Sequence, residues 1–171
     1  YRKDFRALRQ VTEHYIPRIE KAGDRRTLSL LLFWQGFSEA LNLESAAAES
    51  HLDRALDLAR DLQDEECIGY ACMGLLYLRY SHTDRQSRDS MAALAEEAEE
   101  IATRLGDIYL QSKILFAQSL HGLLMGRFED SRRKAQDLVV LGRRAGDPRT
   151  ISMGLYVGAY ERAYSECCEE A

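Results

Sequence analysis

A helix-junction signal recurs four times in this chain of 171 residues, and each occurrence joins a helix-ending residue to a helix-starting aspartate. Glycine adopts the left-handed conformation that ends a helix, and aspartate accepts hydrogen bonds from the free N–H groups that open the next one. The aspartates lie 40, 43 and 40 residues apart (64−24, 107−64 and 147−107), so the spacing predicts an array of helix pairs. The junctions read Ala22-Gly23-Asp24, Leu62-Gln63-Asp64, Leu105-Gly106-Asp107 and Ala145-Gly146-Asp147.

Two residues at these junctions strengthen or weaken the signal. Pro148 directly follows Asp147, at a first helical position, where a residue without an N–H group loses no hydrogen bond. Gln63 stands where the other three junctions have glycine, and we expect it to weaken the end of its helix. The junctions therefore specify an architecture, and they indicate a function only at the level of a repeat scaffold that binds something.

Aligning the units on their aspartates places residues of one class at the same offset. Small residues stand five positions after the aspartate, as expected where a neighbouring helix crosses closely: Ser29, Gly69, Ser112 and Ser152. Large residues recur one helical turn apart, nine and thirteen positions after it, and we expect them in the core. They are Phe33, Met73, Phe116 and Tyr156, then Phe37, Tyr77, Leu120 and Tyr160.

Apolar stripes at helical spacing also precede each aspartate, so every unit contains a second helix. The sequence predicts helices at 2–22, 25–42, 45–62, 65–80, 86–105, 108–125, 127–145 and 148–168. The longest unit carries three extra residues before Met91, and the polar stretch 81–85 is expected to form the longer turn there.

Composition excludes several classes of function. The formal net charge of −5 argues against a nucleic-acid partner, and no apolar run is long enough to span a membrane. The cysteines form no C-x-x-C pair and have no histidine at ligand spacing, so we expect neither a metal site nor a cofactor. The polar N-terminus shows no signal peptide, which favours a cytoplasmic protein. Only two prolines and no linker interrupt the chain, so we expect a single domain over 1–171, as a fragment of a longer protein.

The residues resemble the tetratricopeptide repeat family. Tyr70-x-x-Met73-Gly74-x-x-Tyr77 is similar to the pattern of that family's helix A, and Ala48-x-x-x-Leu52-x-x-Ala55 is similar to its helix B. The period of 40 to 43 exceeds the family's 34 and looks like the stretched units of large bacterial signalling proteins. We therefore expect an all-α, right-handed superhelical solenoid of antiparallel hairpins with about eight helices.

The resemblance also implies a concave groove that binds a partner. Leu28, Ile68 and Ile151 hold groove positions but are expected to be buried against neighbouring helices. The polar residues at groove positions are the expected contacts to a peptide or partner helix, because anchors supply affinity and hydrogen bonds supply orientation. These candidate site residues are Gln35, Ser38, Glu39, Arg79, Gln111, Gln118, His121, Glu161 and Arg162.

Three functions stay open. The first is a protein-interaction scaffold, whose partner could be another domain of a longer parent chain. The second is a sensor segment of a bacterial signalling protein, such as a nucleotide cyclase, ATPase or transcription regulator, that holds a small ligand. The third is a homodimer through a terminal helix, since the last predicted helix is apolar around much of its circumference. An enzyme is not expected, because no catalytic residue set is present: Glu39 and Glu161 have no partner at helical spacing that would tune them.

Overall fold

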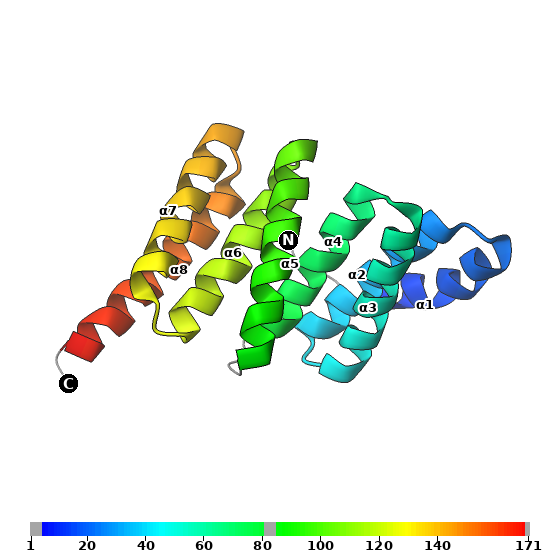
Figure 1. The fold of residues 1–171 in the computed structure, drawn as a ribbon, viewed down its shortest axis with the longest axis horizontal. Helices are drawn as coiled ribbons and strands as arrows, with labels where there is room; N and C mark the ends of the chain where they lie inside the picture. Colours follow the sequence, from blue (N-terminus) through cyan, green and yellow to red (C-terminus); the bar gives the residue numbers. More distant parts are fainter. Residues whose placement is uncertain (1–4, 81–84, 170–171) are drawn as a thin grey trace.

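The computed structural model describes residues 5–80 and 85–169, and this part of the chain contains eight α-helices and no β-strand (Figure 1). Helices pack mainly on their neighbours in sequence, as an array of hairpins. The helices are α1 (Phe5–Ala22), α2 (Arg25–Leu41), α3 (Ser45–Leu62), α4 (Glu65–Arg79), α5 (Arg85–Leu105), α6 (Ile108–Leu124), α7 (Phe128–Ala145) and α8 (Pro148–Glu169). The all-helical fold class predicted from the junctions is therefore confirmed.

The helix boundaries follow the junction chemistry. Asp24, Asp64 and Asp107 each accept a hydrogen bond from the backbone N–H three residues on, at 3.1, 3.0 and 2.9 Å. Such bonds satisfy donors that have no partner within the helix. Predicted residues 2–4 and most of the predicted turn at 81–85 lie outside the described residues, so those parts of the prediction stay untested.

Gln63 ends α3 in the left-handed conformation that glycine adopts at the other junctions. Its φ is +53°, close to the +63° of Gly146 at the end of α7. The helix still ends at Leu62, so replacing glycine by glutamine does not move the helix boundary. The expected weakening is instead a loss of stability, because a residue with a Cβ atom is strained at positive φ.

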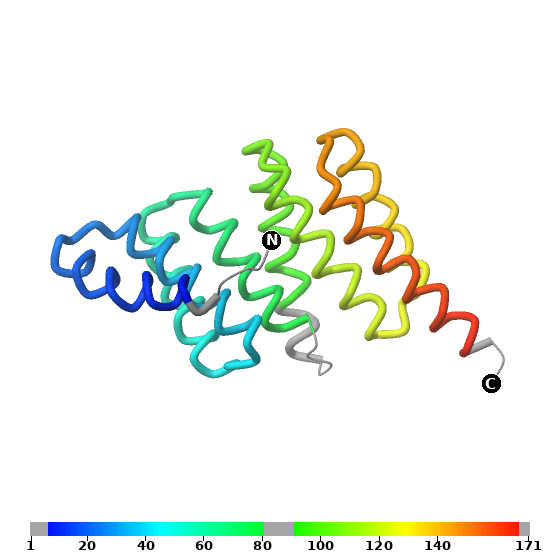
Figure 2. Tube along the Cα trace, turned by 180° about the vertical axis from the view of Figure 1, so that it is seen from behind, coloured from blue at the N-terminus to red at the C-terminus, as the bar shows by residue number. Residues whose placement is uncertain are grey.

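The helices form two layers. The even layer consists of α2, α4, α6 and α8, and each of these helices contacts the next even helix directly. The odd helices pack mainly onto even helices, and long side chains link neighbouring odd helices, as in the ion pair between Arg60 of α3 and Glu97 of α5. Figure 1 shows α3, α5 and α7 in front of the even layer, and Figure 2 shows the even layer from behind. The even helix between two neighbouring odd helices therefore packs against both of them.

The core follows the predicted columns in the first units but not in the last. Phe33 and Met73 are fully buried, whereas Tyr156, at the same offset, is 51% exposed. The ring of Phe33 packs on Tyr70 of the following even helix, with ring centroids 5.4 Å apart. Within the described residues no even helix follows α8, so the expectation that Tyr156 and Tyr160 are core residues is wrong.

The described helices were also compared in length and apolar character with membrane-spanning helices. None of them combines the length and the apolar character that crossing a bilayer requires.

Candidate functional site

Three predicted groove residues lie inside the packing of the first three helices. Gln35, Ser38 and Glu39 are buried, and they form one hydrogen-bond network. Thr12 Oγ1 of α1 donates to Gln35 Oε1, and Gln35 Nε2 donates to Glu39 Oε1 at 3.1 Å. His51 Nδ1 of α3 lies 2.7 Å from Glu39 Oε2, while Ser38 Oγ donates to the Gln35 carbonyl at 2.9 Å. These side chains hold α1, α2 and α3 together.

Arg79 and Gln111 also bond within the chain. Arg79 Nη2 lies 2.8 Å from Glu49 Oε1 and 3.5 Å from Asp53 Oδ1, so it joins α4 to α3. Gln111 Nε2 donates to the Ala102 carbonyl at 3.1 Å, across the junction between α5 and α6. Both side chains are partly exposed, so a partner could still contact them.

Glu161 and Arg162 border a hollow of about 640 Å³ between α7 and α8. Glu161 is buried and binds Arg132 of α7 through both carboxylate oxygens. Arg162 is exposed beside it. The predicted residues thus divide among separate places along the array, and they do not form one continuous groove.

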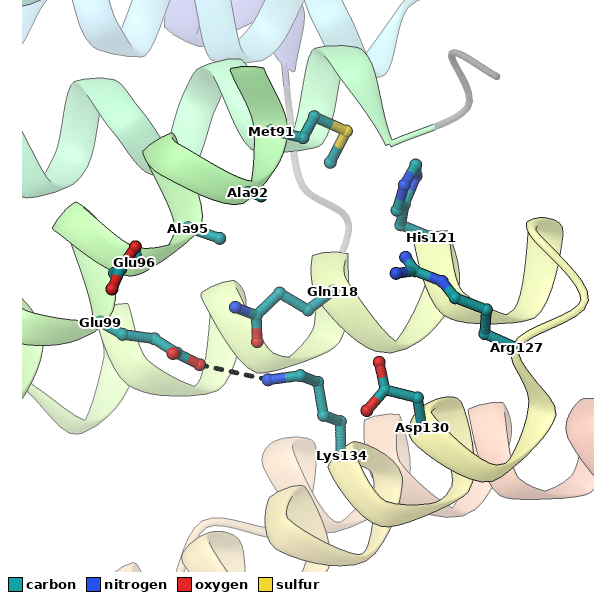
Figure 3. Close-up of a pocket in the computed structure, with 10 residues that line it drawn as sticks. All are labelled: Met91, Ala92, Ala95, Glu96, Glu99, Gln118, His121, Arg127, Asp130 and Lys134. Atoms are coloured by element: carbon teal, nitrogen blue, oxygen red, sulfur yellow. Dashed lines mark hydrogen bonds and ion pairs between the residues drawn. The ribbon is translucent and has the colours of Figure 1, made fainter. Parts of the chain in front are cut away.

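Gln118 and His121 are the predicted residues that the structure brings together in an open hollow. The hollow measures about 380 Å³ and lies between α5, α6 and α7 (Figure 3). Both residues belong to α6, which forms its floor, while α5 and α7 form its walls. Ala95 and Glu99 come from the α5 wall, and Lys134 comes from the α7 wall.

Gln118 Oε1 is buried and has no hydrogen-bond partner, and it is the one buried side-chain nitrogen or oxygen in that state among the described residues. A buried acceptor without a donor costs on the order of 1–3 kcal/mol. Buried polar atoms without a hydrogen-bond partner are therefore rare in folded proteins, and each one needs an explanation. In Figure 3 the amide of Gln118 points into the hollow, between the walls.

The repeat explains why this oxygen lacks a partner. Gln118 and Gln35 each stand eleven residues after the aspartate of their unit (118−107 and 35−24). Gln35 bonds to Thr12, twelve residues before its aspartate, and to Glu39, fifteen after it. In the unit of Gln118 the same places hold Ala95 and Gly122 (107−12 and 107+15). Both internal partners are replaced by residues that cannot form a side-chain hydrogen bond.

His121 adds a second polar group to the floor. Its Nδ1 lies 2.9 Å from the Tyr80 carbonyl, which can only accept, so Nδ1 carries the proton. In the neutral ring this leaves Nε2 as an acceptor. His121 is itself buried, so its bond to Tyr80 also contributes to packing.

Charged residues of both signs line the walls. Lys134 Nζ lies 3.4 Å from Glu99 Oε1, a pair that bridges the α5 and α7 walls (Figure 3). Arg127 and Asp130 line the α7 side, and Glu96 lines the α5 side. The hollow therefore offers hydrogen-bond acceptors on its floor, with three acidic and two basic side chains around them.

The walls of this hollow were not among the residues singled out from sequence. Glu99 and Lys134 belong to odd helices and Arg127 directly precedes α7, whereas the groove positions were assigned to even helices only. The aligned units nevertheless contained a signal. Glutamine is kept at one offset, as Gln35 and Gln118, while Thr12 and Glu39 of the first unit are replaced by Ala95 and Gly122 in the third.

Burial sets the protonation of the two thiols of α4. Cys67 and Cys72 are buried free thiols, and burial raises their pKa to about 11 and about 12, respectively. They are thus protonated at neutral pH and poor nucleophiles. No group of three His, Cys, Asp or Glu side chains in the described part of the chain is placed to hold a metal ion.

Comparison with known proteins assigns no family: no protein-family model matches the chain, and no curated protein matches it significantly.

Proposed function

We propose that this chain is a protein-interaction module of the tetratricopeptide type, and that it holds a peptide segment of a partner in the hollow between α5, α6 and α7. The observation that carries the proposal is the buried Gln118 Oε1, which lacks the donor that Thr12 supplies to Gln35. Turning the amide outward into the hollow would bring this oxygen within reach of a donor from outside the chain. The remaining fold, an array of hairpins with no metal-ligand cluster in its described part, supports a binding role.

A peptide suits the chemistry of the hollow. Its backbone N–H groups are donors for Gln118 Oε1 and for Nε2 of His121, and its carbonyl oxygens are acceptors for Arg127 and Lys134. The volume of about 380 Å³ is at the small end of the range of ligand pockets, so it fits a short anchor segment. Flanking residues of the peptide would then follow the gap between α5 and α7.

The test begins with peptides selected from a random display library against the whole chain, whose affinities are then measured by fluorescence polarisation. Gln118→Leu removes the acceptor and keeps a side chain of similar size. We expect it to weaken binding about tenfold, equivalent to about 1.4 kcal/mol. The melting temperature should stay the same or rise, because the variant no longer buries an unsatisfied oxygen.

A second variant restores the internal partner that this unit lacks. Ala95→Thr places a hydroxyl where Thr12 stands in the first unit, so it should bond to Gln118 Oε1. It should raise the melting temperature and weaken peptide binding together. A merely structural role for Gln118 predicts the first effect without the second.

Gln136→Leu is the matched control, since Gln136 is exposed on α7 and borders the hollow between α7 and α8 instead. It should leave the affinity unchanged. If Gln118→Leu and Ala95→Thr both bind the selected peptides as tightly as the parent chain, the binding surface lies elsewhere and the proposal is wrong.

A further inference from the structure

The hollow between α5, α6 and α7 lies in the one unit that lacks an arginine at two equivalent places of the repeat. Fifteen residues before the aspartate, the first unit has Arg9 and the fourth has Arg132 (24−15 and 147−15). Fifteen residues after it, the second unit has Arg79 (64+15). In the third unit these two places hold Ala92 and Gly122 (107−15 and 107+15). No other unit has a small residue at both.

The arginines of the first two units bind a carboxylate at one shared offset. Arg9 Nε lies 2.9 Å from Glu13 Oε1, and Arg79 Nη2 lies 3.5 Å from Asp53 Oδ1. Glu13 and Asp53 both stand eleven residues before the aspartate of their unit (24−11 and 64−11). An acidic side chain at this offset is therefore paired with an arginine from the same unit in both cases.

The third unit keeps the carboxylate and lacks the arginine. Glu96 stands at the same offset (107−11), is exposed, and lines the α5 wall of the hollow. It forms no ion pair or hydrogen bond through its side chain in the described part of the chain. The two other acidic residues of the hollow are already paired, Glu99 with Lys134 and Asp130 with Arg133. Glu96 is thus the carboxylate that remains for a cation from outside.

The hollow has room for such a cation at the end where Glu96 lies. Ala92 and Ala95 line the α5 wall, where the first unit has an arginine and a threonine. Figure 3 shows Glu96 and Arg127 on opposite sides of Gln118, with Arg127 beside His121. A cation that enters on the α5 side therefore reaches Glu96 without passing the guanidinium of Arg127, which would repel it.

We propose that the partner segment inserts an arginine side chain into this hollow, and that the guanidinium pairs with the carboxylate of Glu96. The inference rests on the function proposed above and names the chemistry of the anchor. The inserted arginine takes the place that Arg9 and Arg79 have in the first two units. An arginine suits the site better than a lysine, because its planar fork of donors can serve the carboxylate and the outward-turned amide oxygen of Gln118 together.

The peptides selected from the display library give the first test. We expect them to share an arginine, and its replacement by glutamine should weaken binding to the parent chain about tenfold in fluorescence polarisation. Glu96→Gln should weaken the binding of the unchanged peptides about three- to tenfold. If the two groups pair, the losses are not additive, so the glutamine peptide should lose much less affinity with Glu96→Gln than with the parent chain.

A second variant restores the internal arginine. Ala92→Arg places it at the offset of Arg9, four residues before Glu96, just as Arg9 precedes Glu13. It should occupy the hollow and weaken peptide binding at least tenfold, with no fall in the melting temperature. Ala92→Lys replaces it if circular dichroism shows a loss of helix. Glu100→Gln is the matched control and should leave the affinity unchanged, because Glu100 is exposed on the same helix but borders a different hollow.

The outcomes separate this inference from the proposed function. If Gln118→Leu weakens binding while Glu96→Gln and Ala92→Arg do not, the hollow binds a peptide without a basic anchor, and only this inference is wrong. Selected peptides that share no arginine, or losses that simply add, would overturn it in the same way. If no variant of the hollow changes the affinity, or if the library contains no binder, both proposals fail.

Discussion

Arg132 and Glu161 form a two-point contact between α7 and α8, with Nε 3.0 Å from Oε2 and Nη2 2.8 Å from Oε1. The carboxylate is only 2% exposed, whereas about half of the arginine side chain faces solvent. Two parallel N–H donors match both carboxylate oxygens, which a lysine ammonium cannot do. The pair therefore places a buried negative charge at the interface of the last hairpin.

Replacing this arginine should destabilise the last hairpin. Arg132→Met removes the donors and leaves the carboxylate of Glu161 buried, so we expect the free energy of unfolding to fall by about 1–3 kcal/mol. The free energy of unfolding of Arg132→Lys should lie between those of Arg132→Met and the parent chain. Urea denaturation measures both. Arg133→Met is the control, since Arg133 pairs with Asp130 in an exposed position, and it should change stability by less than about 0.5 kcal/mol.

Two glycines of α8 should respond in opposite ways to the same substitution. A Cβ at Gly154 would lie 2.6 Å from the Ala135 carbonyl oxygen, a backbone atom of α7, whereas one at Gly158 would meet nothing within 4 Å. Gly154→Ala should therefore cost about 1–3 kcal/mol in unfolding free energy. Gly158→Ala should gain about 0.5–1 kcal/mol, because alanine favours a helix more than glycine does. Equal thermal shifts for the two variants would contradict this packing.

A substitution at the end of α3 should stabilise the protein. Gln63 adopts a φ of +53°, which strains a residue with a Cβ, so Gln63→Gly should raise the free energy of unfolding by up to about 1 kcal/mol. The converse change, Gly146→Gln at the end of α7, should lower it by a similar amount. Thermal melts of both variants check this, and a Gln63→Gly protein that melts below the parent chain would contradict it.

Asp147 makes the start of α8 sensitive to acid. The Thr150 hydroxyl donates to Asp147 Oδ2 at 2.7 Å and holds the pKa of that carboxyl below its ordinary value of 3.8. Because the folded pKa is lower than the unfolded one, the carboxylate contributes stability above about pH 4 and loses it as the pH falls through the folded pKa. Asp147→Ala should cost about 0.5–2 kcal/mol at neutral pH.

Melts at several pH values separate the charge from the hydrogen bond. Asp147→Asn retains an oxygen that can cap the helix but does not titrate, so its stability deficit relative to the parent chain should shrink as the pH falls below 4. A deficit that is constant with pH would show that the charge contributes nothing at this junction.

The sequence located the helices accurately because the junctions act locally. Gly23, Gly106 and Gly146 all have φ between +63° and +72°, and the aspartates after them accept backbone hydrogen bonds in the next helix. These interactions involve only neighbouring residues, so residue type and spacing were enough to predict them.

The orientation of the polar residues could not be obtained in the same way. Periodicity shows that Gln35 and Glu39 share a helix face, but not that Thr12 of α1 and His51 of α3 cover that face. Coverage depends on the neighbouring helices, and it changes along the array. The same offset that buries Gln35 therefore leaves Gln118 beside an open hollow.

The stacking of the helices also determines how force passes through the molecule. Within the described residues, helices in contact are never more than two places apart in the chain. Tension applied to the two ends is thus carried by successive helix–helix interfaces in series. Amide exchange should reflect this arrangement, with slow exchange in the middle helices and faster exchange toward α1 and α8, whose amides can open without disturbing the rest.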